Sequence, residues 1–203
     1  MATVHELLLR AFAGVADDAA LIAGFGSLRQ RFDFPVADWT LQRGLQTPEF
    51  RAYGALATPS GIADADLRRL LAIVRELPIL AGTVPTLDRL ERVVKVGGAS
   101  AGESPQFHYV VEMDPAKGWE DELFRWYDTE HMPGLAAVPG CVRAQRFLNR
   151  DSGPYSLACY DLTDPGARES PAWLAVRHTS WSDRVRPQFR NTRRTLFRSL
   201  AAG

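Results

Sequence analysis

The stretch WYDTEHMPG, residues 126–134, ends the first predicted helix of a six-element unit that the chain carries twice. Its first six residues place an indole, a phenol, two carboxylates and an imidazole close together. No comparable cluster ends the corresponding helix of the first unit. We therefore expect the second unit to carry the chemistry and the first unit to serve as scaffold.

Hydrophobic periodicity on both sides of this stretch predicts the order strand, helix, strand, strand, helix, strand. Pro133 and Gly134 are expected to stop the helix. The predicted elements of the second unit are residues 106–113, 119–131, 142–148, 155–162, 172–189 and 192–200. The same order predicts a first unit at residues 3–12, 17–32, 36–45, 50–57, 63–77 and 87–96.

The spacing of the two units supports a duplication. His5 and His108 each lie near the start of a first strand, and 108 − 5 = 103. An antiparallel sheet with two helices on one face leaves its other face bare, and a second such sheet can cover it. The sequence therefore predicts an α+β fold of two repeats, at residues 1–97 and 106–203, joined by a Gly- and Ser-rich linker at residues 98–105.

The overall composition is that of an ordinary globular protein, with 46% hydrophobic and 24% charged residues. The formal net charge is zero, so no overall field favours nucleic acid or an anionic membrane as a partner. No signal-peptide pattern and no apolar run of about 18 residues occurs, which predicts a cytoplasmic protein. The arginine-rich residues 184–198 are expected to form a solvated surface or, alternatively, to contact an anion or carboxylate.

The second unit resembles the dimeric α+β barrel superfamily of ferredoxin-like folds, and within it the EthD-like proteins. The resemblance rests on residues 126–133, on Val138-Pro139-Gly140 and on the strand at 142–147 that contains Arg146. It implies tandem ferredoxin-like βαββαβ repeats that form a pseudo-dimeric α+β barrel within one chain, as a monomer or a homodimer. In the first copy, Ser27 and Leu28 stand where the second has Glu130 and His131, so a second equivalent site is not expected.

His131 is the prime catalytic candidate, because an imidazole with a pKa near 6.5 exchanges protons at neutral pH. Tyr127 lies four residues before it, on the same helix face, and Glu130 is expected to orient the imidazole or pair with its charge. The alternative is a histidine that only caps its own helix. His108 is the second candidate: its strand face, shared with Glu112, would point into the cavity if that face lines the barrel.

A small-molecule substrate is the expected partner. Its binding is expected to use Trp126, Arg146, Tyr155 and Phe197. A salt bridge is the alternative role for Arg146, and packing in the core is the alternative for Tyr155 and Phe197. No zinc spacing and no GxGxxG occurs in the sequence, so we expect neither a metal nor a bound cofactor.

The superfamily includes cofactor-independent cyclases, dehydratases, isomerases and monooxygenases, as well as haem-binding branches. The resemblance therefore implies an enzyme of secondary metabolism or aromatic catabolism. The first reading is a cofactor-independent lyase or isomerase in which His131 acts as general base on a cyclic or polyketide-like carbonyl compound. The alternatives are a cofactor-free monooxygenase of a phenolic or anthrone-like substrate and a non-catalytic small-molecule-binding barrel.

Overall fold

The computed structural model describes residues 3–12, 16–31 and 36–200. Contacts divide the chain into two compact units, Met1–Glu91 with Phe197–Gly203 and Arg92–Leu196. These boundaries fall inside two strands and not at the predicted linker, residues 98–105. The reason is strand pairing, because the start of β4 (Thr86–Gly97) pairs with β1 and the end of β8 (Phe189–Leu200) pairs with β2.

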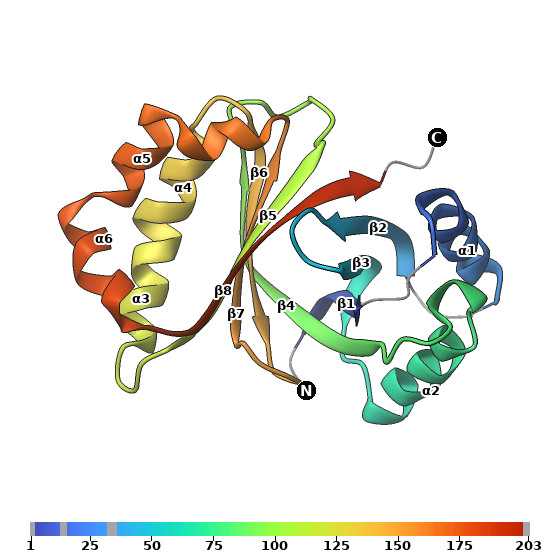
Figure 1. Cartoon of the computed structure of the whole chain (residues 1–203). Coiled ribbons are helices and arrows are strands. Elements are labelled where there is room, and N and C mark those ends of the chain that lie inside the picture. Colours follow the sequence, from blue (N-terminus) through green and yellow to red (C-terminus); the bar gives the residue numbers. More distant parts are fainter. Residues whose placement is uncertain (1–2, 13–15, 32–35, 201–203) are drawn as a thin grey trace. The chain divides into compact units, whose positions relative to one another are not determined.

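The first unit is an antiparallel sheet with two helices (Figure 1). Its strands follow the order β4-β1-β3-β2. Alternate residues of β1, such as Leu7 and Leu9, are fully buried and pack in one core with Phe25 and Val74 of the helices. Its elements, besides β4, are β1 (Val4–Phe12), α1 (Asp18–Arg31), β2 (Val36–Gly44), β3 (Glu49–Ser60) and α2 (Asp64–Arg75).

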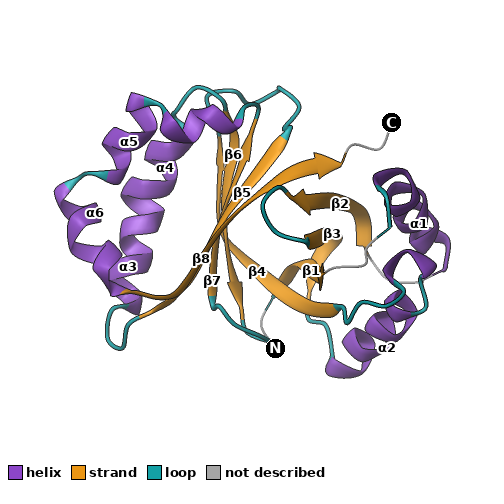
Figure 2. Ribbon diagram, viewed as in Figure 1, coloured by secondary structure: helices purple, strands orange, loops and turns teal. Residues whose placement is uncertain are grey.

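The second unit repeats this arrangement, with the strand order β8-β5-β7-β6. Its helices cover one face of its sheet (Figure 2), and Met113, Ala144, Ala158 and Tyr160 of that face pack in a core with the helices. Its elements, besides β8, are β5 (Phe107–Pro115), α3 (Glu120–Trp126), α4 (Met132–Ala136), β6 (Cys141–Asn149), β7 (Ser156–Leu162), α5 (Pro171–Arg177) and α6 (Ser180–Val185).

The predicted fold class is confirmed. The eight strands follow the closed-barrel order β1-β3-β2-β8-β5-β7-β6-β4, and each repeat has the 4-1-3-2 order of a ferredoxin-like unit. The first strands of the two repeats begin at Val4 and Phe107, and 107 − 4 = 103, the predicted offset. No helix of the described residues is long and apolar enough to span a membrane.

Residues 98–105, predicted to be a linker, begin as a segment tied to the second unit by backbone hydrogen bonds. The Gly98 N–H donates to the Val142 carbonyl at 2.9 Å, and the Ser100 N–H donates to the Cys141 carbonyl at 2.9 Å. The Ala99 N–H donates to the Ala136 carbonyl at 2.8 Å. These bonds fix residues 98–100 against β6 and α4.

The predicted stop of the first helix at Pro133 and Gly134 is wrong. After α3, residues Tyr127–His131 form a π-helical turn in which the Met132 N–H donates to the Tyr127 carbonyl, and α4 follows directly. Pro133 lies in the first turn of α4, where its missing N–H is tolerated. Gly134 packs against α5, since a Cβ there would lie 2.9 Å from Cγ1 of Val176.

Candidate active site

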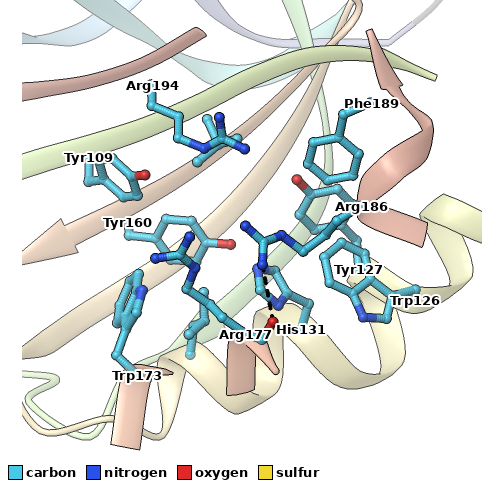
Figure 3. Close-up of a pocket in the computed structure, with 12 residues that line it drawn as sticks. Tyr109, Trp126, Tyr127, His131, Tyr160, Trp173, Arg177, Arg186, Phe189 and Arg194 are labelled. Atoms are coloured by element: carbon cyan, nitrogen blue, oxygen red, sulfur yellow. Dashed lines mark hydrogen bonds between the residues drawn. The ribbon is translucent and has the colours of Figure 1, made fainter. Parts of the chain in front are cut away.

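The second unit contains a cavity between the helix-covered face of its sheet and the helices (Figure 3). It opens to solvent, with about 30 Å³ accessible to water inside a region of about 360 Å³. The walls are predominantly aromatic, with His131 at one side and arginines around the space. The lining residues are Tyr109, Val111, Trp126, Tyr127, His131, Leu135, Tyr160, Trp173, Arg177, Arg186, Phe189 and Arg194.

His131 is held by its ring contacts at the end of the π-helical turn. Its imidazole stacks on the Trp126 indole with ring centroids 4.2 Å apart, and it meets the Tyr127 ring edge-on at 5.5 Å. The side chain is 8% exposed, and its Nδ1 atom has no hydrogen-bond partner among the described residues. A buried polar atom without a partner costs stability, and a catalytic role is one explanation for such an atom.

Glu130 is hydrogen-bonded to the indole of Trp126 and not to the imidazole of His131. Its Oε1 atom accepts hydrogen bonds from Trp126 Nε1 at 3.1 Å and from Thr179 Oγ1 at 2.5 Å. These bonds fix the indole on which His131 stacks. The predicted direct pairing of Glu130 with the His131 charge is therefore wrong, because the carboxylate is engaged with the indole and a hydroxyl.

The charge state of the site follows from burial. Burial, reinforced by the nearby Arg186 and Arg177, lowers the pKa of His131 to about 3, so the imidazole is neutral in the free protein at physiological pH. Burial also raises the pKa of Tyr127 above its usual range, so its phenol stays protonated and acts as a hydrogen-bond donor. The expectation of a histidine that titrates near pH 6.5 is wrong, because that value belongs to a solvated ring.

This lowered pKa predicts acid-sensitive folding. Below pH 6.5 the unfolded chain binds a proton at His131 that the folded chain does not bind until about pH 3. His131 should therefore make the free energy of unfolding fall by up to about 1.4 kcal/mol per pH unit between these values. Urea denaturation at several pH values should show a shallower fall for His131→Gln than for the exposed control His178→Gln. Identical slopes in the two variants would contradict the buried neutral state.

His108 does not share a cavity with His131. On β5 the residues Tyr109 and Val111 face the helices, so His108 and Glu112, at alternate positions, face the other side of the sheet. His108 Nδ1 lies 2.7 Å from Asp161 Oδ1, and Arg143 Nε donates to the second oxygen of Asp161 at 2.9 Å. This hydrogen-bonded group holds a buried charge and is separate from the cavity.

Of the four residues predicted to contact the substrate, one lines the cavity and three lie elsewhere. Trp126 lines the cavity, whereas Arg146, Tyr155 and Phe197 do not. Arg146 donates to Asp128 at 2.7 Å and its guanidinium lies 4.2 Å from the Phe124 ring centroid, so it braces the helix against the sheet. Tyr155 precedes β7 and packs on Phe124, and Phe197 belongs to the first unit, where the Arg51 guanidinium lies over its ring.

Several residues that line the cavity were not predicted from the sequence. Arg186 and Arg194 belong to the arginine-rich residues 184–198, for which an anion contact was the alternative reading. Arg177 and Trp173 lie on α5, and only the packing of α5 over the sheet brings them to the cavity. Strand alternation from Met113, which packs under the helices, could have identified Tyr109 as a cavity residue.

Side chains that commonly bind metals do not form a metal site in the part of the chain that the structure describes. No group of three or more His, Cys, Asp or Glu side chains is placed to hold an ion.

The first unit also contains a cavity, but neither a histidine nor an arginine is among the described residues that line it. About 180 Å³ is open beside α1 and β2, lined mainly by apolar side chains such as Phe25, Trp39 and Leu41. Leu28, which the sequence aligns with His131, is 2% exposed and belongs to the apolar core. This unit therefore has no imidazole at the corresponding place.

Solved structures share this fold over nearly the whole chain. An anthrone oxidase-like protein is 15% identical over 97% of this chain and 92% of its own, with a TM-score of 0.61. A candidate monooxygenase from Fusobacterium nucleatum is 9% identical over 99% and 94%, with a TM-score of 0.66. Chlorite dismutase from Candidatus Nitrospira defluvii is 8% identical over 96% and 91%, with a TM-score of 0.61.

No family model matches the chain, and no curated protein matches its sequence. At these identities the structural likeness establishes the fold alone. The chain thus shares the ferredoxin-like, dimeric α+β barrel fold with anthrone oxidase-like, monooxygenase-like and chlorite dismutase proteins. The EthD-like resemblance of the helix end has no support from these comparisons.

Proposed function

We propose that this protein is a cofactor-independent monooxygenase that oxidises a phenolic or anthrone-like substrate in the cavity of the second unit. The observation that carries the proposal is the buried, neutral imidazole of His131, whose Nδ1 atom lacks a partner beside an aromatic cavity with a cationic rim. The anthrone oxidase-like and monooxygenase-like fold relatives favour oxygen chemistry over the lyase or isomerase reading. An EthD-like origin of residues 126–133 is part of this proposal.

The cavity supports the first step, removal of a proton from a carbon or oxygen acid of the substrate. A neutral imidazole can accept that proton, and the resulting imidazolium then lies beside the anion it has created. This opposite charge raises the imidazole pKa above its value of about 3 in the free protein, so His131 becomes a stronger base once the substrate anion forms beside it. Arg186 and Arg177 further favour the anionic form of the substrate.

The oxidation then needs no electron source besides the substrate. The delocalised anion passes electrons to dioxygen, a carbon–oxygen bond forms, and the peroxide loses water to leave a carbonyl. For an anthrone the balance is anthrone plus O₂ giving anthraquinone plus H₂O. The protonated Tyr127 phenol is suited to donate a hydrogen bond to the developing oxyanion.

Oxygen consumption tests this function. With 1,8-dihydroxyanthrone as the substrate, we expect protein-dependent uptake of one O₂ per quinone formed, and ¹⁸O₂ should place one labelled oxygen in the product. The rate without protein measures autoxidation and is subtracted. Turnover of carbonyl substrates under anaerobic conditions, with no change in oxidation state, would instead support the lyase or isomerase reading. Absence of any turnover together with retained ligand binding would support a binding barrel.

A further inference from the structure

Three arginines from different elements point into the cavity of the second unit (Figure 3). Arg177 ends α5, Arg186 follows α6 and Arg194 lies on β8. Arg177 and Arg186 are half-buried, and Arg194 is exposed. Sequence separation does not predict this convergence, because it depends on the packing of α5 and α6 over the sheet.

These arginines differ in their partners from four other arginines of the second unit. Arg143, Arg184 and Arg193 each bind a carboxylate, as does Arg146. Among the described residues, Arg177, Arg186 and Arg194 bind none, and Arg186 Nη1 donates only to the Arg177 carbonyl, at 3.1 Å. Three guanidinium groups around one space therefore have no carboxylate bonded to them, and Asp183 acts on Arg186 only through a longer-range attraction.

Repulsion from these guanidinium groups lowers the pKa of groups that line the cavity. Partial burial, together with Arg177 and Arg194, lowers the pKa of Arg186, and Arg186 and Arg177 also contribute to the lowered pKa of His131. Clustered like charges without a partner are unfavourable, and an anion placed among them removes the repulsion. The surrounding Tyr109, Tyr160 and Trp173 offer ring faces and edges to a planar ligand.

We propose that Arg177, Arg186 and Arg194 bind a carboxylate carried on the aromatic ring of the substrate, so the substrate class is an aromatic carboxylic acid. A planar carboxylate matches the fork of a guanidinium, and its ring then lies against the tyrosines and the tryptophan. The identification of this ligand as a substrate rests on the proposed monooxygenase function. The binding specificity itself does not.

Calorimetric titration of the full chain with an unreactive pair of ligands tests the proposal. The pair is 2-naphthoate and 2-naphthamide, which share a ring system and differ in charge. We expect the naphthoate to bind about 10–100-fold more tightly, and its affinity to fall as salt concentration rises. Arg186→Gln should weaken the naphthoate by about tenfold or more and leave the naphthamide within about twofold. Arg190→Gln, an exposed neighbour that bonds only backbone carbonyls, is the matched control.

The outcomes separate this inference from the proposed function. Equal affinities for the two ligands, or a loss of naphthoate affinity as large in Arg190→Gln as in Arg186→Gln, would overturn the carboxylate site. Such a result would leave oxygen-dependent turnover of a neutral phenol untouched. Conversely, tight and arginine-dependent binding of the naphthoate supports the carboxylate site even where no aromatic acid is oxidised, a result that would count against the monooxygenase alone.

Discussion

Replacement of His131 by glutamine is expected to lower kcat for oxygen-dependent turnover by about 10²–10⁴-fold, the usual contribution of a general base. Glutamine keeps a polar side chain of similar length but cannot take the substrate proton. Because the cavity walls and the three arginines remain in place, KM should change by less than about threefold. Initial rates of oxygen uptake at several substrate concentrations separate the two quantities.

The matched control for this experiment is His178→Gln. His178 is an exposed histidine that directly follows α5, outside the cavity, so its loss should leave kcat unchanged. Circular dichroism and thermal unfolding of both variants check that the fold is retained. A His131→Gln protein that is folded and turns over at the wild-type rate would remove His131 from the mechanism, and Tyr127 would become the next group to test.

The second large effect concerns folding. Gly98→Ala should destabilise the protein by about 3 kcal/mol or more, because a Cβ at this position would lie 2.0 Å from the Cys141 carbonyl oxygen and 2.6 Å from its carbonyl carbon. These are backbone atoms of β6, so no side-chain rotation relieves the overlap. Movement of the chain would break the Gly98 hydrogen bond to Val142. For a chain of this size the expected fall in Tm is roughly 6–12 °C.

The neighbouring glycine provides the control. A Cβ on Gly97 would meet nothing within 4 Å, so Gly97→Ala should change the Tm by no more than a few degrees. Differential scanning calorimetry of the two variants makes the comparison. Equal Tm values for them would show that the chain around Gly98 can move to accommodate a Cβ without loss of stability.

The order of elements could be predicted from the sequence because it depends on local patterns. Apolar residues that repeat with strand or helix periodicity located all eight strands, and the 103-residue offset linked the two repeats. The π-helical turn had no such signal. Pro133 and Gly134 each commonly end helices, and their acceptance inside one depends on the wide turn before them and on close packing against Val176.

The candidate site shows a similar limit. Strand alternation correctly grouped His108 with Glu112, but it does not say which face of the sheet the helices cover. That choice is made by long-range packing, and it separates His108 from His131. Likewise the sequence alone predicts a histidine with an ordinary pKa. In the folded protein, burial and the nearby Arg186 and Arg177 lower the pKa of His131.

The π-helical turn also bears on how such a site can arise. Relative to an α-helix, a turn that bonds Met132 to Tyr127 holds one additional residue. An insertion absorbed within a helix changes which side chains face the sheet, and the strands on either side keep their pairing. One copy of a duplicated domain can thus acquire a new set of cavity residues in a single genetic event, with its sheet unaltered.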